Sequence, residues 1–223
     1  MIWALRGCLS WRARRLTHDM VVTCLLRHSS MLSAIIATHE SERALVRTLT
    51  ALVPATAAGV LTEVVIADAG SRDATAEVAE FAGCRFISST DPIGMRLKAA
   101  AASTRSPWLM FLRAGVAPEA AWLQAAEGFM AANNSDSGPR AAVFRPAAIG
   151  DLTRPGLSEL GALLRVTFGA RPRPEQGLLI ARRSYDALGG HPESEQAETM
   201  LLRRLGRRKL TVLPAAIALA RFS

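Results

Sequence analysis

Cysteines are scarce in this chain, and their spacing excludes two kinds of site. Three of the 223 residues are cysteines, Cys8, Cys24 and Cys84, and no two of them form a Cys-x-x-Cys pair. Zinc sites and thioredoxin-type redox sites therefore have no support. An odd number of cysteines without a disulfide framework fits a reducing compartment, so we expect a cytoplasmic location.

Long apolar runs are also missing. No stretch approaches the roughly 18 consecutive apolar residues of a membrane span, and Val21–Leu26 is too short for the core of a secretory signal. Half of the residues are hydrophobic and 21% are charged, which is a globular composition. A chain of this length can form one well-cored α/β domain.

Basic residues are in excess, and the formal net charge is +8. One block lies within residues 1–30 and another comprises Arg203, Arg204, Arg207, Arg208 and Lys209. Such blocks can bind nucleic acid or anionic lipid, or they can be a solvated helix end. Because aromatic residues do not interleave with the basic ones as a stacking surface requires, we favour the helix end. We expect no specific nucleic acid, and peripheral membrane contact stays open.

Residues 1–30 show no hydrophobic period, whereas a strand pattern begins at Met31. We interpret the first segment as a disordered or mis-assigned extension, with an arginine-rich targeting or membrane-surface peptide as the alternative. Residues 31–223 are then one domain, because they show neither an internal repeat nor a second core.

From Met31 onward, strand-like and helix-like patterns alternate. The first helix is expected to bury Leu45, Val46, Leu49 and Leu52 on one face, and the second Val78 and Phe81. Crossover helices between strands predict an α/β fold with a mostly parallel central sheet and helices on both faces. The expected strands cover 32–37, 63–67, 85–88, 108–112, 141–144, 177–181 and 210–213, and the expected helices cover 41–53, 73–81, 94–104, 118–131, 157–168, 184–188 and 195–205.

Two expected strands end abruptly at small and acidic residues. The first runs into Ala37-Thr38-His39-Glu40, and the second runs into Asp68-Ala69-Gly70-Ser71-Arg72-Asp73-Ala74-Thr75. In open α/β sheets, ligands bind at the carboxyl ends of the strands, so Glu40 and Asp68 lie where a ligand would be held. Gly70 suits a turn with positive φ, and Ser71 or Asp73 suits the cap of the following helix.

These motifs resemble the family 2 glycosyltransferases, in particular short bacterial members without membrane helices, over about residues 31–221. The family has a strand that runs into Asp-x-Gly-Ser-x-Asp-x-Thr, and its later motifs match Gln176-Gly177, Arg182-Arg183-Ser184, Leu188-Gly189-Gly190 and Arg203-Arg204-Leu205. The resemblance implies a single GT-A-like domain that binds a nucleotide-diphospho-sugar. It places Thr38, Glu40 and Asp68 in the nucleotide pocket and Gln176 among the substrate-binding residues.

The sequence departs from this family where the family holds a metal. An acidic motif after the fourth strand binds Mg²⁺ or Mn²⁺ there, whereas this chain has Arg113-Ala114-Gly115. Neither arginine nor glycine has the side-chain oxygen that a hard cation needs. We therefore expect no metal from this motif, and we expect Arg96, Lys98 and Arg113 to meet the charge of the diphosphate.

Inverting members of the family use a carboxylate as the general base. Aligning on Arg203-Arg204-Leu205 puts Glu198 at that position, with Glu193 and Glu195 as alternatives of register and a solvated helix-start glutamate as the structural alternative. The resemblance therefore implies an inverting transfer of a sugar to an unknown acceptor. The rival interpretation is a catalytically inactive descendant that binds a nucleotide or a partner protein.

Overall fold

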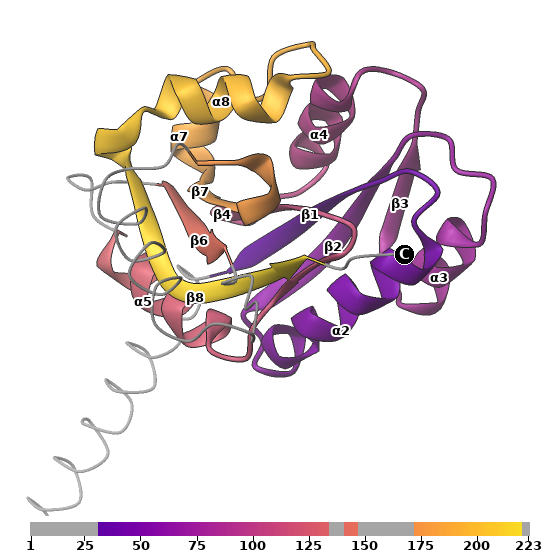
Figure 1. Ribbon diagram of the computed structural model, residues 1–223, viewed down its shortest axis with the longest axis horizontal. Helices are drawn as coiled ribbons and strands as arrows, with labels where there is room; N and C mark the ends of the chain where they lie inside the picture. Colours follow the sequence, from indigo (N-terminus) through magenta and orange to yellow (C-terminus); the bar gives the residue numbers. More distant parts are fainter. Residues whose placement is uncertain (1–30, 134–140, 147–171, 220–223) are drawn as a thin grey trace, which may run out of the picture.

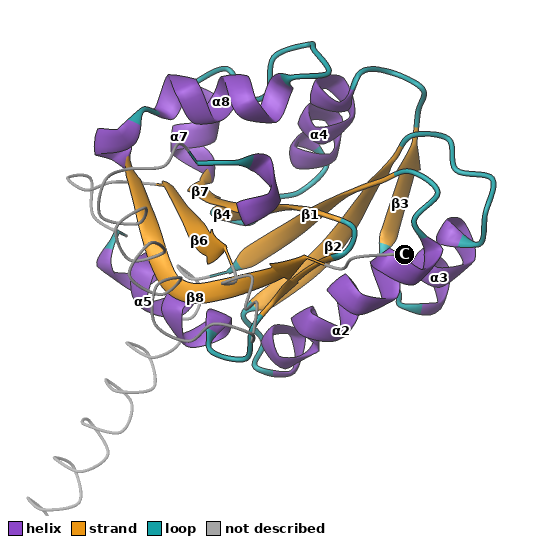
Figure 2. Ribbon diagram, in the orientation of Figure 1, coloured by secondary structure: helices purple, strands orange, loops and turns teal. Residues whose placement is uncertain are grey.

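The computed structural model describes residues 31–133, 141–146 and 172–219. The expected helix at 157–168 and the extension at 1–30 lie outside these residues. The domain consists of one eight-stranded sheet in the order β3-β2-β1-β4-β7-β6-β8-β5, with helices on both faces (Figures 1 and 2). This confirms the predicted α/β class with a single sheet.

Parallel pairing holds the first half of the sheet together. β1 (Leu32–Thr38) lies between β2 (Leu61–Asp68) and β4 (Trp108–Arg113), and β3 (Arg85–Ser88) pairs with β2, all parallel. β6 (Ala141–Pro146) pairs with β8 (Leu210–Leu219) in parallel. β7 (Leu178–Ala181) runs antiparallel to β4 and β6, as β5 (Val116–Pro118) does to β8.

The helices divide between the two faces of the sheet. α2 (Glu42–Ala57), α3 (Thr75–Phe81) and α5 (Trp122–Ala132) cover one face, and α4 (Ile93–Ala102), α7 (Arg182–Ala187) and α8 (Ala197–Leu205) cover the other (Figure 1). Short 3₁₀ turns, η1 (Pro174–Gln176) and η2 (Arg207–Lys209), precede β7 and β8. Alternation along β1 supplies both cores: Leu32, Ala34 and Ile36 face one side, and Ile35 and Ala37 face the other.

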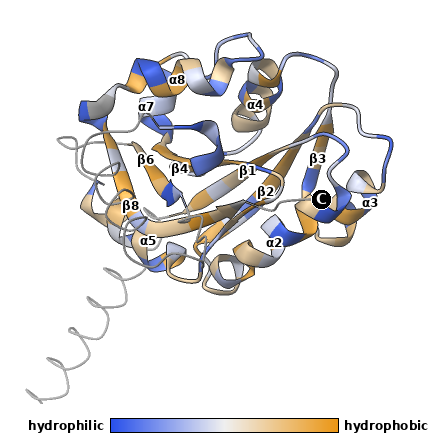
Figure 3. Ribbon diagram, in the orientation of Figure 1, coloured by the Kyte–Doolittle hydropathy of each residue, from blue (hydrophilic) through white to orange (hydrophobic). Residues whose placement is uncertain are grey.

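Apolar residues follow this division, since the strands are mostly apolar and the helices mix apolar and hydrophilic residues (Figure 3), with their buried residues in the two cores. Leu45 and Leu52 are buried on α2 as expected, but Val46 is 48% exposed. Phe81 is 93% exposed, so its predicted inward position is wrong. The reason is that α3 ends at Phe81, beside the short edge strand β3, and Ala79 and Thr75 are its buried residues.

Several element boundaries differ from the prediction, and two of the differences involve β5 and β8. The helix expected from Pro118 begins at Trp122, because Pro118 belongs to β5 and pairs with Ile217 of β8. The last strand is longer than expected and continues to Leu219, since its second half pairs with β5. β5 has 3 residues, which are too few to show a period in the sequence.

Candidate active site at the carboxyl edge of the sheet

The carboxyl ends of β1, β2 and β4 meet at one edge of the sheet. Thr38 lies opposite Asp68 in the register of β1 and β2, and Ala37 lies opposite Arg113 in the register of β1 and β4. The topology therefore brings together three of the predicted site residues, which are up to 75 positions apart in the sequence.

Asp68 organises this edge. Its carboxylate is fully buried and accepts hydrogen bonds from the Thr38 hydroxyl (2.8 Å), the Gly70 and Ser71 amides (2.8 and 2.7 Å), and the Ser71 and Ser88 hydroxyls. Burial disfavours the charged form, but the hydrogen bonds from Ser71, Thr38 and Gly70 outweigh it and lower the pKa of Asp68. Because both oxygens of Asp68 already accept these hydrogen bonds, Asp68 fixes the turn at Gly70 and Ser71 that follows β2. A contact of Asp68 with a nucleotide stays a prediction.

The loop after β1 is joined to the loop after β2 through Glu40. This residue has a φ of +46°, its backbone amide donates to the Ser71 hydroxyl (2.9 Å), and its Oε1 accepts from the Arg72 amide (2.9 Å). Asp73 extends the connection, because it accepts from the amides of Glu42 and Thr75. The expected turn is present, since Gly70 has a φ of +81°. The expected cap is wrong in its position, because Ala74 precedes α3 and Asp73 bonds the Thr75 amide from one residue earlier.

Arg96 and Lys98, both expected near the phosphates, differ in their surroundings. Arg96 is buried, and its guanidinium donates to the Ala67 carbonyl (2.7 Å) and the Asp91 carbonyl (3.0 Å). Burial lowers the pKa of Arg96. Arg96 therefore ties α4 to the end of β2, beside Asp68, whereas Lys98 lies on the exposed side of α4. A phosphate contact of either residue stays a prediction.

Arg113 and Glu198 form an ion pair across the edge of the sheet, although they lie 85 positions apart in the sequence. Both Nε and Nη2 of Arg113 donate to the same oxygen, Glu198 Oε2, with an Nε distance of 2.9 Å. The hydrogen bond with Glu198 raises the pKa of Arg113. None of the described residues donates to Glu198 Oε1. The structure thus places the predicted base beside the predicted phosphate-binding cation and leaves one carboxylate oxygen available.

Gly115 follows β4 in a tight turn, with a φ of +88°. Its amide donates to the Thr48 hydroxyl (3.0 Å) and the Ala44 carbonyl (3.1 Å) of α2. In the described part of the chain, no group of three or more His, Cys, Asp or Glu side chains could hold a metal ion. The cation at the end of β4 is Arg113, which is paired with Glu198. The loss of the family's metal motif and the metal independence both stay predictions.

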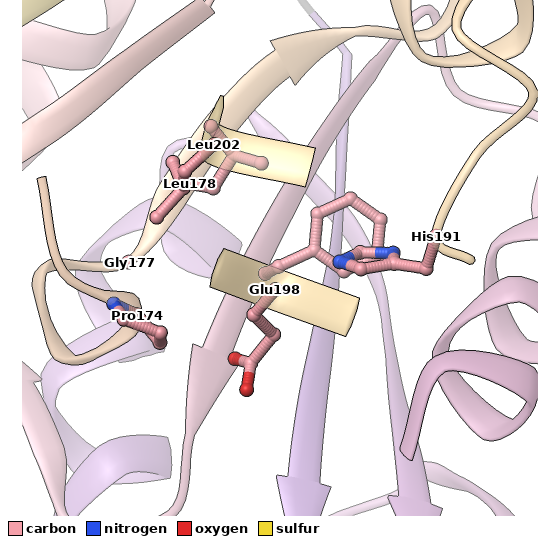
Figure 4. Close-up of a pocket in the computed structure, with 7 residues that line it drawn as sticks. Pro174, Gly177, Leu178, His191, Glu198 and Leu202 are labelled. Atoms are coloured by element: carbon pink, nitrogen blue, oxygen red, sulfur yellow. The ribbon is translucent and has the colours of Figure 1, made fainter. Parts of the chain in front are cut away.

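A pocket opens beside the ion pair, and Glu198 is one of its walls (Figure 4). The Glu198 side chain extends between Pro174 and His191 in that view. The pocket is lined by Phe111, Pro174, Gly177, Leu178, His191, Glu198 and Leu202.

Gln176 precedes Gly177 of the pocket and holds η1 in place. Its side-chain amide donates to the Phe144 carbonyl (2.8 Å) and accepts from the Arg173 amide (2.8 Å), which fixes η1 against β6. Gly177 then approaches β4 closely, since a Cβ atom there would lie 2.8 Å from the Leu112 side chain. A direct contact of Gln176 with substrate stays a prediction.

His191, which lines the pocket, and Tyr185, which contacts His191, are residues that motif reasoning did not select. His191 is 1% exposed, and its Nδ1 lies 2.9 Å from the Tyr185 hydroxyl. Burial lowers the pKa of His191 to about 3 and raises the pKa of Tyr185 to about 12. The sequence contained no marker for this pair, because a lone histidine after Gly-Gly has no recognisable partner.

The basic block after residue 202 ends α8. Arg203 and Arg204 lie in its last turn and are exposed, as are Arg208 and Lys209. This is the helix-end arrangement that we favoured, and cations there interact favourably with the helix dipole. Contact with a membrane surface stays a prediction. Among the described residues, no helix is both long and apolar enough to cross a membrane.

Comparison with known proteins gives one family match and many similar folds. The family model described as Glycosyl transferase family 2 matches residues 33–147. No curated protein sequence matches the chain.

Two solved structures of glucosyl-3-phosphoglycerate synthase from Mycobacterium tuberculosis illustrate the fold similarity. The complex with phosphoglyceric acid has a TM-score of 0.64 and 19% identity, covering 89% of this chain and 75% of that one. The complex with Mn²⁺, UDP-glucose and phosphoglyceric acid has a TM-score of 0.63 and 19% identity, covering 89% and 76%. At this identity the likeness establishes the fold.

Proposed function

The chain belongs to glycosyl transferase family 2, and we propose that this glycosyltransferase moves a sugar from a nucleotide-diphospho-sugar to an acceptor hydroxyl with inversion. The observation that carries the proposal is the ion pair between Arg113 and Glu198 at the carboxyl edge of the sheet. It joins a cation suited to a diphosphate with a carboxylate suited to proton abstraction. The similar synthase structure holds UDP-glucose, which supports the donor class.

In the proposed reaction, Arg113 binds the diphosphate of the donor, and Glu198 Oε1 accepts the proton of the acceptor hydroxyl. The acceptor oxygen forms a bond to the anomeric carbon, while the bond from that carbon to the diphosphate oxygen breaks. The electron pair of the broken bond leaves on the nucleoside diphosphate. Thr38, Glu40 and Asp68 hold the two loops that receive the nucleotide. We also propose a cytoplasmic location, where such donors occur with reduced thiols.

Donor binding is tested first, by the melting temperature with UDP or GDP, each with Mn²⁺ or with EDTA. A ligand that binds the folded state raises the melting temperature by mass action. We expect stabilisation that EDTA leaves unchanged, and loss of it in Arg113→Ala. Because that variant leaves Glu198 without its cation, Arg113→Lys is measured as well and should keep part of the effect. Stabilisation that requires Mn²⁺ would show that a metal site exists.

Turnover is tested with UDP-glucose by measuring the release of UDP. We expect Glu198→Gln to keep the donor-induced stabilisation and to lose about 10²–10⁴-fold in turnover, because an amide cannot take the proton. Glu195→Gln is the matched control, since Glu195 is exposed before the same helix. Loss in the control but not in Glu198→Gln would assign the base to Glu195. A product that retains the anomeric configuration would contradict inversion.

A further inference from the structure

His191 is held rigidly in the wall of the pocket. Its ring lies edge-on to Phe111, with a centroid distance of 4.7 Å, and Tyr185 stacks on the same Phe111 ring at 5.2 Å. Gly190 has a φ of +72°, and a Cβ atom there would lie 3.2 Å from the Tyr185 ring. The imidazole therefore has one orientation, which is set by Phe111 on β4, by Tyr185 on α7 and by the turn that joins α7 to α8.

The hydrogen bonds around Tyr185 determine which nitrogen of His191 carries the proton. The backbone amide of His191 donates to the Tyr185 hydroxyl oxygen at 3.2 Å. Among the described residues, the acceptor within reach of the hydroxyl hydrogen is His191 Nδ1, at 2.9 Å. Since burial keeps the imidazole neutral, with a pKa of about 3, the ring has a single hydrogen. Nδ1 accepts, and so Nε2 carries the hydrogen.

The Nε2 hydrogen is directed at the pocket. None of the described residues accepts a hydrogen bond from Nε2. Every buried side-chain nitrogen or oxygen in the described part of the chain has a hydrogen-bond partner, so Nε2 is not one of these buried atoms. Nε2 is therefore accessible, and the pocket is the cavity that His191 lines. The pocket thus presents two unused polar groups, the neutral donor His191 Nε2 and the anionic acceptor Glu198 Oε1.

We propose that His191 and Glu198 together bind an uncharged hydroxyl group, so that the acceptor is a neutral sugar or polyol. This inference rests on the proposed function, in which that hydroxyl is the attacking group. Its oxygen accepts from His191 Nε2 and its hydrogen is donated to Glu198 Oε1, which receives the proton as the bond to the anomeric carbon forms. The two side chains thereby fix the direction in which the oxygen lone pair points.

The charges in the pocket disfavour an anionic acceptor. The imidazole is neutral, and Arg113 is engaged first by Glu198 and then by the donor diphosphate, so a carboxylate or phosphate group would meet the negative charge of Glu198. The other walls at Phe111, Leu178 and Leu202 are apolar, and the cavity of about 10 Å³ has room for a single hydroxyl group. This differs from the similar synthase structure, which holds phosphoglyceric acid.

The direct test is nitrogen NMR of the imidazole in the whole protein, with the His191 signals assigned as those missing in His191→Phe. We expect a neutral ring at pH 7 with hydrogen on Nε2. Methyl glucoside or glycerol, added with saturating UDP, should shift the Nε2 resonance, while 3-phosphoglycerate at the same ionic strength should not. A shift with 3-phosphoglycerate alone, or no shift with any of these compounds, would overturn the inference. UDP stabilisation is measured separately, so failure of donor binding is recognised on its own.

Kinetics with UDP-glucose provide the second test. In His191→Phe, which keeps the ring packing and removes the donor, KM for the neutral acceptor should rise about tenfold, the effect of one hydrogen bond, with UDP stabilisation unchanged. His191→Gln, which restores an N–H group, should recover part of the loss. Tyr185 is a positioning residue, so Tyr185→Phe should change the tautomer ratio by NMR and raise KM less. An unchanged KM in His191→Phe would overturn the inference.

Discussion

Acidification below pH 6.5 should destabilise this protein through protonation of His191. Burial lowers the pKa of His191 from 6.5 to about 3 in the folded chain. In the unfolded chain the imidazole has its ordinary pKa, so the unfolded state binds the proton first. The stability contributed by neutral, buried His191 is therefore present above pH 6.5 and is lost as the pH falls from 6.5 to about 3.

The magnitude follows from the same two values. Each pH unit in this window costs about 1.4 kcal/mol of unfolding free energy, and the whole window is on the order of 4–5 kcal/mol. Globular domains have total stabilities of about 5–15 kcal/mol. The cost of protonating this one side chain is therefore a large fraction of the stability, and protonation would expel His191 from its place against Phe111 and Tyr185.

The assay is urea denaturation at a series of pH values, comparing the wild type with His191→Phe. The variant is less stable at pH 7, because the Tyr185 hydroxyl loses its acceptor, but its stability should vary less between pH 6.5 and 4, so the two curves converge. Carboxylate titration is common to both proteins and cancels in the difference. His39→Gln, at an exposed histidine, is the control and should run parallel to the wild type. Parallel curves for His191→Phe would refute the reasoning.

Three further predictions concern the frame around the site. Asp68→Ala should lower the free energy of unfolding by about 3–5 kcal/mol in urea denaturation. Asp68→Asn should lower it less, because its amide oxygen can still accept from the Gly70 and Ser71 amides and the hydroxyl groups can accept from its amide nitrogen. Equal losses in the two variants would contradict this prediction. Gly94→Ala should destabilise α4 by about 1–3 kcal/mol, because the new Cβ would meet the Pro192 carbonyl, while the same change at Gly128, where nothing lies within 4 Å, should be neutral or stabilising. Deletion of residues 1–30 should leave the melting temperature nearly unchanged, and a large decrease would show that they pack on the domain.

The features predicted best are those with a local physical cause. A buried parallel strand is a short apolar run, and the runs ending at Thr38, Asp68 and Leu112 are each strands within one or two residues. Glycine at positive φ is likewise local, and Gly70 adopts the conformation that its place in the motif requires. The turn chemistry after β2 was therefore accessible from the sequence.

The features that escaped prediction depend on contacts between distant segments. Phe81 has helical spacing like a core residue, yet the edge of the sheet leaves nothing for it to contact. Pro118 resembles a helix start, but it belongs to β5, which pairs with β8. The pairing of His191 with Tyr185 arises from a double-glycine turn that folds the chain back by six residues. The hydrophobic periodicity of the sequence does not predict this contact between Tyr185 and His191.

The ion pair of Arg113 and Glu198 explains how a cation can stand at the end of β4 before the donor arrives. A half-buried guanidinium without a counter-ion would lose hydration and gain nothing in return, and Glu198, only 9% exposed, would have the same difficulty alone. Each neutralises the other in the free protein. In the proposed reaction, a diphosphate carries more negative charge than one carboxylate, so it would compete with Glu198 for Arg113 when the donor binds. Glu198 would then lose its cation when an acceptor hydroxyl can use its oxygen, which would couple donor binding to the strength of the proposed base.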